Sequence, residues 1–343
     1  MDVFTHFLLP YAAAIVLFGL HRAKASGLSI EEEAVWERRA ALAAVFGFAG
    51  FAPDLDGFMS GLKHLPGLYF IQHRGLSHTL IGAPLYALAA TGLLALAARR
   101  WPERLGIFRW RNGFIPAAIL GSWTHLVLDG LTYSGVPLLW PFAAGRVTLH
   151  LFHWIIDWFF PIGLVVIALH LFRRFDRIAV ARAGVALVLA MVILAGARFG
   201  NMPDPEEPGA LVFPRDDPKE WTVLVPVDGG WEGRLWRDGR YAGIMTFHDD
   251  RQPGSEEAIE TARSSDAYKG FLMGSFGPVI IQSHQEGDRW TVIFIDVAQR
   301  FEAATGPEWT PTQESWSRAG TQDWGYLELS VSNPEVSVRA WGW

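Results

Sequence analysis

The sequence predicts an α-helical, multi-pass membrane domain of about six spans, followed by a β-rich soluble domain outside the cytoplasm. Half of the 343 residues are hydrophobic and 19% are charged, whereas soluble proteins average about 25% charged residues. Residues 1–199 contain 17 Lys and Arg against 11 Asp and Glu, whereas residues 200–343 contain 12 against 24. Nine of the eleven histidines also lie in the first part. We therefore predict a transmembrane domain over residues 1–199, a linker over 200–212 and a β-rich domain over 213–343.

The composition excludes several kinds of site. The chain has no cysteine, which excludes disulfides, thiolate zinc sites and a cysteine nucleophile. Its net charge is −6, and its basic residues do not cluster with aromatic ones, so we expect no nucleic-acid partner. The first residues, Met1-Asp2-Val3, lack the positive charge of a signal peptide, so we expect the apolar run after them to remain as a membrane span.

Apolar stretches predict the spans. A helix needs about 20 largely apolar residues to cross a bilayer. The candidate stretches cover residues 3–20, 40–53, 78–98, 114–131, 151–172 and 178–199. The second stretch is short, which predicts either a re-entrant segment or a helix that starts in the residues before it. Residues 57–72 contain glycine and proline and predict an irregular loop.

Basic residues predict the orientation of these spans. One alternate set of connections carries 13 Lys and Arg residues, whereas the other carries only Lys63, Arg74 and Arg146. Basic connections stay in the cytoplasm. We therefore expect a protein of the bacterial cytoplasmic (inner) membrane, with its N-terminus and its C-terminal domain outside the cytoplasm.

Short runs of β-forming residues predict the fold of the C-terminal domain. They follow a proline-rich stretch over 201–209, and Asp-Gly turns separate some of them. The predicted strands cover residues 221–227, 241–247, 279–283, 290–297 and 326–331. Residues 255–264 predict a helix. Nine of the sixteen tryptophans lie in this part; we interpret them as core, with a surface that faces sugar or lipid as the alternative.

Ionisable residues gather at one depth of the predicted membrane domain. Such residues are costly inside a span and mark functional sites. With the orientation above, the carboxylates and most histidines of five separate segments fall near the outer ends of the spans. The metal ligands that we predict from them are His6, Asp54, Asp56, His73, His78, His125, Asp129, His153 and Asp157.

Two pairs among these residues have the spacing of a chelate. His125 and Asp129, like His153 and Asp157, are four residues apart, which places both side chains on one face of a helix. Imidazole and carboxylate without thiolate suit Zn²⁺, with Mn²⁺ or Fe²⁺ as alternatives. The competing interpretations are a satisfied core histidine and a polar clamp between helices. Convergence of five segments favours the metal site.

The same residues resemble a known family. Thr5-His6, Pro53-Asp54-Leu55-Asp56, the box from His73 to Thr79 and the pair of His125 with Asp129 are similar to motifs of the YdjM-like inner-membrane proteins. That family is described as membrane-bound metal-dependent hydrolases. The resemblance covers about residues 1–200 and does not extend to the C-terminal domain.

The family is in turn distantly similar to the zinc-dependent phospholipase C and single-strand nuclease superfamily. The ligand order of that superfamily is met by His6, then Asp54 or Asp56, then His73 or His78, then the two spaced pairs. Two departures reduce the expected number of ions from three to one or two. The superfamily uses an N-terminal tryptophan where this chain has Met1, and it places a further histidine between the two pairs, where this chain has only His150.

The resemblance and the residues together predict a metal-dependent hydrolase at the outer face of the cytoplasmic membrane, and they favour a phosphoester as its substrate. A metal lowers the pKa of bound water to about 7. Asp129 is the expected bridge between two ions, Asp54 or Asp56 the general base, and Arg74 either a phosphate contact or an interfacial charge. The expected partners are membrane lipid and an amphiphilic substrate, such as a phospholipid or a polyprenyl phosphate.

Two other functions stay open at this point. A transporter or metal-handling membrane protein would line a path with polar residues through the full membrane depth, but the inner halves of the later spans contain almost none. A non-catalytic envelope scaffold would bind polymer through its outer domain.

Overall fold

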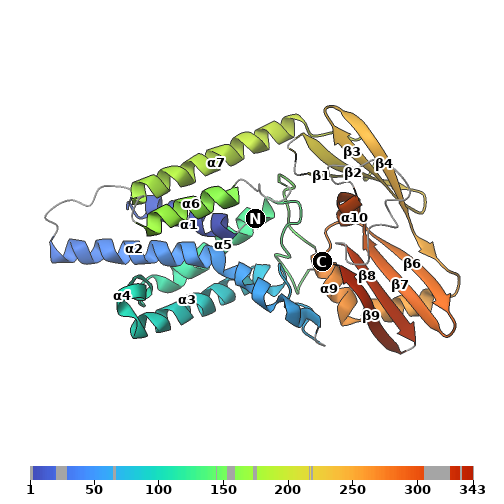
Figure 1. Cartoon of the computed structure of the whole chain (residues 1–343), viewed down its shortest axis with the longest axis horizontal. Coiled ribbons are helices and arrows are strands. Elements are labelled where there is room, and N and C mark those ends of the chain that lie inside the picture. The colour runs from blue at the N-terminus through green and yellow to red at the C-terminus, as the bar shows by residue number, and fades with distance from the viewer. Residues whose placement is uncertain are drawn as a thin grey trace. The chain divides into compact units, whose positions relative to one another are not determined.

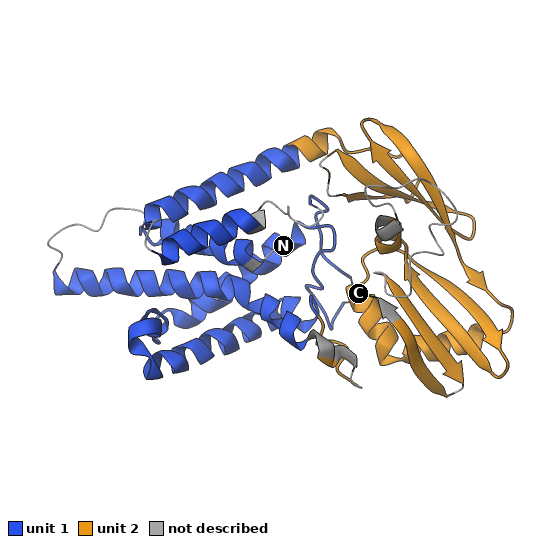
Figure 2. Cartoon of the chain, in the orientation of Figure 1, with its two compact units in different colours: residues 1–60, 73–196 blue, residues 61–72, 197–343 orange. Residues whose placement is uncertain are grey.

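The structure is a computed structural model of the whole chain. It describes residues 3–20, 29–64, 67–143, 145–152, 159–172, 176–215, 217, 219–304, 325–332 and 334–342. These residues form two compact units (Figure 2). Unit 1 comprises residues 1–60 and 73–196, and unit 2 comprises residues 61–72 and 197–343.

Unit 1 is helical (Figure 1). Its long helices are α1 (Val3–Leu17), α2 (Ile30–Phe51), α3 (Gly82–Arg100), α5 (Phe114–Gly130), α6 (Phe159–Leu171) and α7 (Arg177–Gly200), whose last turn belongs to unit 2. The shorter ones are η1 (Ala52–His64), η2 (Leu76–His78), α4 (Pro102–Leu105) and η3 (Gly106–Phe108). Helix α2 packs against both α1 and α5, and α3 packs against α5.

The predicted helical character of the N-terminal part is confirmed. Among the described residues, three helices are long and apolar enough to cross a membrane: Ile30–Met59, Gly82–Arg100 and Arg177–Gly200. Shorter apolar helices cover Phe4–Leu17 and Pro161–Leu171. The full number of six spans stays a prediction.

Helix α2 starts well before the short apolar stretch over 40–53. A capping box fixes its start: the Ser29 hydroxyl accepts from the Glu32 amide at 3.3 Å, and the Glu32 carboxylate accepts from the Ser29 amide at 2.8 Å. The short stretch predicted either a re-entrant segment or a helix that starts in the residues before it. The structure has the second, because α2 starts at Ile30. The irregular loop predicted from residue 57 begins later, because η1 continues to His64.

Small residues let the helices of unit 1 approach closely. A Cβ atom at Gly121 of α5 would lie 2.3 Å from the Phe46 carbonyl oxygen of α2, and one at Gly50 would lie 2.6 Å from the His6 carbonyl oxygen of α1. Such contacts are possible only where the side chain is absent. They bring α1, α2 and α5 together at the positions of His6 and His125.

Unit 2 contains two sheets. The four-stranded sheet is antiparallel, in the order β1 (Leu211–Pro214), β2 (Glu220–Val227), β3 (Gly230–Arg237), β4 (Arg240–His248). The five-stranded sheet has the order β5 (Asp250–Arg251), β6 (Val279–Glu286), β7 (Arg289–Asp296), β8 (Tyr326–Ser332), β9 (Glu335–Gly342), with only β5 and β6 parallel. Its helices are α8 (Glu256–Ser264), α9 (Asp266–Gly274) and α10 (Val297–Ala304).

The predicted β-rich fold is confirmed, and each of the five predicted strands and the predicted helix has a counterpart. Asp238 and Gly239 join β3 to β4 with φ angles of 49° and 79°, as expected of a tight hairpin turn. The sequence did not predict β1, β3, β5 and β9, or helices α9 and α10. Strand β3 was missed because glycine and charged residues interrupt its apolar pattern, and β1 begins inside the predicted linker.

We expect Gly121→Ala to lower the thermal stability of the purified protein in detergent. Overpacking a tight contact costs about 1–3 kcal/mol, and the obstructing atom here is backbone. Gly92→Ala in α3 is the matched control, because a Cβ at Gly92 would meet nothing within 4 Å; it should be neutral or stabilise the helix by up to about 1 kcal/mol. Equal melting temperatures of the two variants would contradict the close packing of α2 and α5.

Candidate metal centre

The structure brings together all the predicted ligands that it describes. His6 comes from α1, Asp54 and Asp56 from η1, His73 and His78 from the segment before α3, and His125 and Asp129 from α5. All seven belong to unit 1. His153 and Asp157, the other predicted pair, lie outside the described residues.

The imidazole rings of His78 and His125 point their Nε2 nitrogens at each other, at a distance of 3.0 Å. The Nδ1 atom of His125 lies 2.7 Å from the Gly50 carbonyl oxygen. Because a carbonyl only accepts, this Nδ1 carries the hydrogen. In its neutral form, His125 therefore presents a lone pair at Nε2.

His78 is also held at its Nδ1 atom. Its Nδ1 lies 2.8 Å from the Ser77 hydroxyl, which donates to the Asp56 carboxylate. The Ser77 oxygen therefore accepts from Nδ1–H of His78, and the Nε2 atom of His78 also carries a lone pair. Two lone pairs at 3.0 Å repel unless a cation, either a shared proton or a metal ion, lies between them. Histidines held at their second nitrogen in this way are typical of metal sites.

Two carboxylates complete this arrangement. Asp54 Oδ1 lies 3.6 Å from the Nε2 atoms of both His78 and His125. Asp129 Oδ2 lies 3.4 Å from the first and 3.7 Å from the second. Ligand atoms around a tetrahedral zinc ion, with bonds of about 2.0–2.1 Å, lie about 3.3 Å apart. The donor set and its spacing fit a divalent ion.

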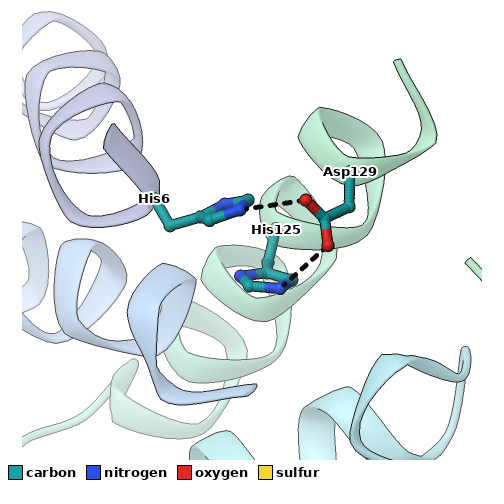
Figure 3. A group of neighbouring side chains, drawn as sticks. All are labelled: His6, His125 and Asp129. Carbon is teal, nitrogen blue, oxygen red and sulfur yellow. Dashed lines mark hydrogen bonds and ion pairs between the residues drawn. The ribbon is translucent and has the colours of Figure 1, made fainter. Parts of the chain in front are cut away.

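His6 adds a second group on the other side of Asp129. Figure 3 shows His6 on α1 and the pair of His125 and Asp129 on α5, with His6 Nε2 3.2 Å from Asp129 Oδ1. The His6 and His125 rings stack, with centroids 3.8 Å apart. The described residues thus form two possible ligand groups, His6 with His125 and Asp129, and Asp54 with His78 and His125. They share His125, which is consistent with one or two ions.

Asp56 and His73 lie at the edge of the cluster. Asp56 Oδ1 accepts from His73 Nδ1 at 2.9 Å, and Asp56 Oδ2 accepts from Ser77. The His73 side chain is 45% exposed, whereas those of His6, His78 and His125 are completely buried. In this structure Asp56 orients His78 through Ser77, and its predicted roles as ligand and general base stay predictions.

Arg74 forms an ion pair with Asp129 of the cluster. Its guanidinium lies 3.3 Å from Asp129 Oδ2 and also contacts the hydroxyls of Thr132 and Ser134. The side chain is 6% exposed, and its backbone φ of 61° is unusual for a residue other than glycine. The surrounding contacts therefore fix its conformation.

The described side chains of the cluster include three buried carboxylates and one guanidinium. Asp54, Asp56 and Asp129 are 1–4% exposed and contribute three negative charges, whereas Arg74 contributes one positive charge. Buried charge without a counterion is costly. Among these described side chains the carboxylates therefore outnumber the guanidinium, and a cation held between them would offset the excess negative charge. Asp54 Oδ2 and His6 Nδ1 are also buried without a hydrogen-bond partner in the described part of the chain.

The sequence did not predict the groups that orient the side chains of the cluster. The Gly50 carbonyl and the Ser77 hydroxyl orient the histidine ligands, and the hydroxyls of Thr132 and Ser134 contact Arg74. Ser77 lies inside the box from His73 to Thr79, so its position was available as a signal. The Gly50 carbonyl was not, because its role depends on the approach of α5 to α2.

Unit 1 is an apolar helical unit with a buried His/Asp cluster suited to a metal ion. The family model for the YdjM inner membrane protein matches residues 1–202, and the chain therefore belongs to this family of inner membrane proteins. The resemblance drawn from the sequence is confirmed, and so is its membrane character; the orientation stays a prediction. The match contains the whole cluster and ends before β1. No curated protein and no solved structure matches the chain.

We expect the purified protein to bind one or two equivalents of zinc, and His125→Ala to lose it, because His125 belongs to both ligand groups. Elemental analysis of protein purified in detergent measures this. His170→Ala is the matched control: His170 lies on the apolar helix α6 and pairs with the Tyr11 hydroxyl at 3.1 Å, away from the cluster. Stoichiometric zinc in the His125 variant would contradict the site.

Proposed function

We propose that the protein is a metal-dependent hydrolase of the membrane and that it acts on a phosphoester. The observation that carries the proposal is the facing Nε2 pair of His78 and His125, with oxygens of Asp54 and Asp129 3.4–3.7 Å away. Zn²⁺ suits these ligands best, with Mn²⁺ or Fe²⁺ as alternatives. One or two ions would be held by His6, Asp54, His78, His125 and Asp129.

Each side chain of the cluster has a distinct part in this proposal. A bound divalent ion supplies Lewis acidity, which polarises a phosphoryl oxygen and acidifies water. Asp129 presents Oδ1 to His6 and Oδ2 to His78, which suits a bridging carboxylate. Asp54 is the better general base, because its Oδ2 has no hydrogen-bond partner among the described residues, whereas Asp56 uses both oxygens. Arg74 balances the charge of Asp129 and is the group suited to a phosphate oxygen.

The position of the cluster along the helices supports a substrate at the membrane surface. His6 lies near the start of α1, Asp54 follows the end of α2, and His125 and Asp129 lie in the last turns of α5. The basic connections lie beyond the opposite ends of these helices. With six spans and basic loops in the cytoplasm, the cluster would face the outer surface, together with the C-terminal domain.

A site at that depth suits an amphiphile that presents its headgroup to the surface. We therefore propose a lipid phosphoester as substrate, such as a phospholipid or a polyprenyl phosphate, with membrane lipid as the partner of the protein. The carboxylates and most of the histidines of these helices gather near one end, which favours this function over a transport path.

We expect Asp54→Asn to lower kcat on a phosphoester by about 10²–10⁴-fold, the usual contribution of a general base. The amide keeps an oxygen for the ion but cannot accept a proton. Turnover is measured over a panel of water-soluble and lipid phosphoesters at zinc concentrations that saturate each variant. Asp176→Asn is the control, because Asp176 is exposed and its carboxylate accepts from the Ala179 amide at the start of α7. Unchanged turnover in the Asp54 variant would exclude this residue as the base.

We also expect a chelator to abolish turnover and added zinc to restore it. Restoration by Mn²⁺ or Fe²⁺ but not by Zn²⁺ would reassign the metal. Turnover that a chelator leaves unchanged, in protein shown by elemental analysis to be free of metal, would contradict a metal-dependent reaction.

A further inference from the structure

Residues 61–72 connect two parts of the candidate metal centre. The centre belongs to unit 1, but these residues belong to unit 2. On one side of this segment lie Asp54 and Asp56, and on the other side His73 and Arg74. The segment nevertheless belongs to unit 2, together with residues 197–343 (Figure 2). The chain thus leaves unit 1 after residue 60 and returns to it at His73.

Three side-chain contacts hold the segment to helix α9. The Gly67 amide donates to Asp266 Oδ2 at 2.6 Å, and the Gln72 amide nitrogen donates to the Gly270 carbonyl at 2.8 Å. Lys269 Nζ lies 5.8 Å from the centroid of the Tyr69 ring, which is within cation–π distance. The hydrogen bond from Gly67 also lowers the pKa of Asp266, so the acceptor is ionised at neutral pH.

Helix α9 is itself fixed within unit 2. Ser265 caps its start by accepting from the Tyr268 amide. Phe271 is completely buried in a core with Phe294 of β7 and Leu327 of β8. The helix therefore offers the segment a rigid support.

Gln72 contacts α9 and directly precedes His73 of the metal centre. It is 5% exposed, so its amide would be left without a partner if the contact with Gly270 were lost. The next residue, His73, holds Asp56 at 2.9 Å, and Arg74 after it reaches Asp129 from a left-handed backbone conformation. A conformation of that kind persists only when the surrounding structure fixes it.

We propose that helix α9 of the C-terminal domain positions His73 and Arg74 in the metal centre by holding the segment 61–72. Gln72 and Asp266 are the positioning residues. The inference deepens the proposed function, on which it rests, because it assigns to the C-terminal domain the control of metal affinity at that site. Helix α9 lies beyond the residues of the family match, so this control comes from the part of the chain that the match does not contain.

The test uses the full chain in detergent and compares Asp266→Ala and Gln72→Ala with wild type. Hydrogen–deuterium exchange, followed by mass spectrometry on metal-free protein, reports on peptides that cover residues 67–76. We expect faster exchange there in both variants, with unchanged exchange in β7. A zinc competition titration then measures affinity, which we expect to fall about tenfold, as for other residues that orient metal ligands.

Two further variants separate positioning from a general loss of structure. Glu260→Ala on α8 is the matched control, because Glu260 pairs with Arg263 three residues on, as Asp266 pairs with Lys269, and it should behave as wild type. Asp266→Asn keeps an oxygen that accepts from the Gly67 amide, so it should restore most of the protection and of the zinc affinity.

The outcomes are distinct. Unchanged exchange over residues 67–76 in the alanine variants would overturn the inference, and so would faster exchange with wild-type zinc affinity. If wild-type protein binds no zinc and hydrolyses no phosphoester, the proposed function fails and control of metal affinity fails with it. Exchange at residues 73–76 would then still show whether α9 positions His73 and Arg74.

Discussion

The buried charge of the cluster is the constraint on which unit 1 depends. Three carboxylates and one guanidinium share a space in which His78 and His125 turn lone pairs toward each other at 3.0 Å. Buried carboxylates of this kind are costly unless positive charge compensates them. Helix packing serves the same constraint, because Gly121 lets α5 approach α2 until the Gly50 carbonyl can hold His125.

Much of the cluster could be predicted because its spacing is local. His125 and Asp129 share a helix face through periodicity alone, and both lie in the described centre. Periodicity says nothing about contacts between elements. Asp54 and Asp56 looked equivalent in sequence, yet only Asp56 is held by both His73 and Ser77, because η1 turns their carboxylates in different directions.

The fold of the C-terminal part was predictable where its strands are apolar and its turns contain Asp-Gly, and less so elsewhere. Strand β3 contains glycine at 230 and 233 and charged residues at 232, 234 and 237. Gly233 leaves room for the Phe301 ring of α10, a reason that only the tertiary structure reveals. The grouping of residues 61–72 with unit 2 was equally hidden. It depends on a backbone amide of Gly67 and on the side chains of Tyr69 and Gln72, none of which belongs to a periodic pattern.

Metal binding and the contact between residues 61–72 and α9 are thermodynamically linked if one affects the other. If contact with α9 strengthens metal binding by some factor, then a bound metal must strengthen the contact with α9 by the same factor. The Gln72 side chain lies on this path because it is buried against Gly270 while the next residue holds Asp56. Occupancy of the site would therefore stabilise the hold of α9 on residues 61–72, and any ligand of the C-terminal domain that displaced α9 would weaken metal binding to the same extent.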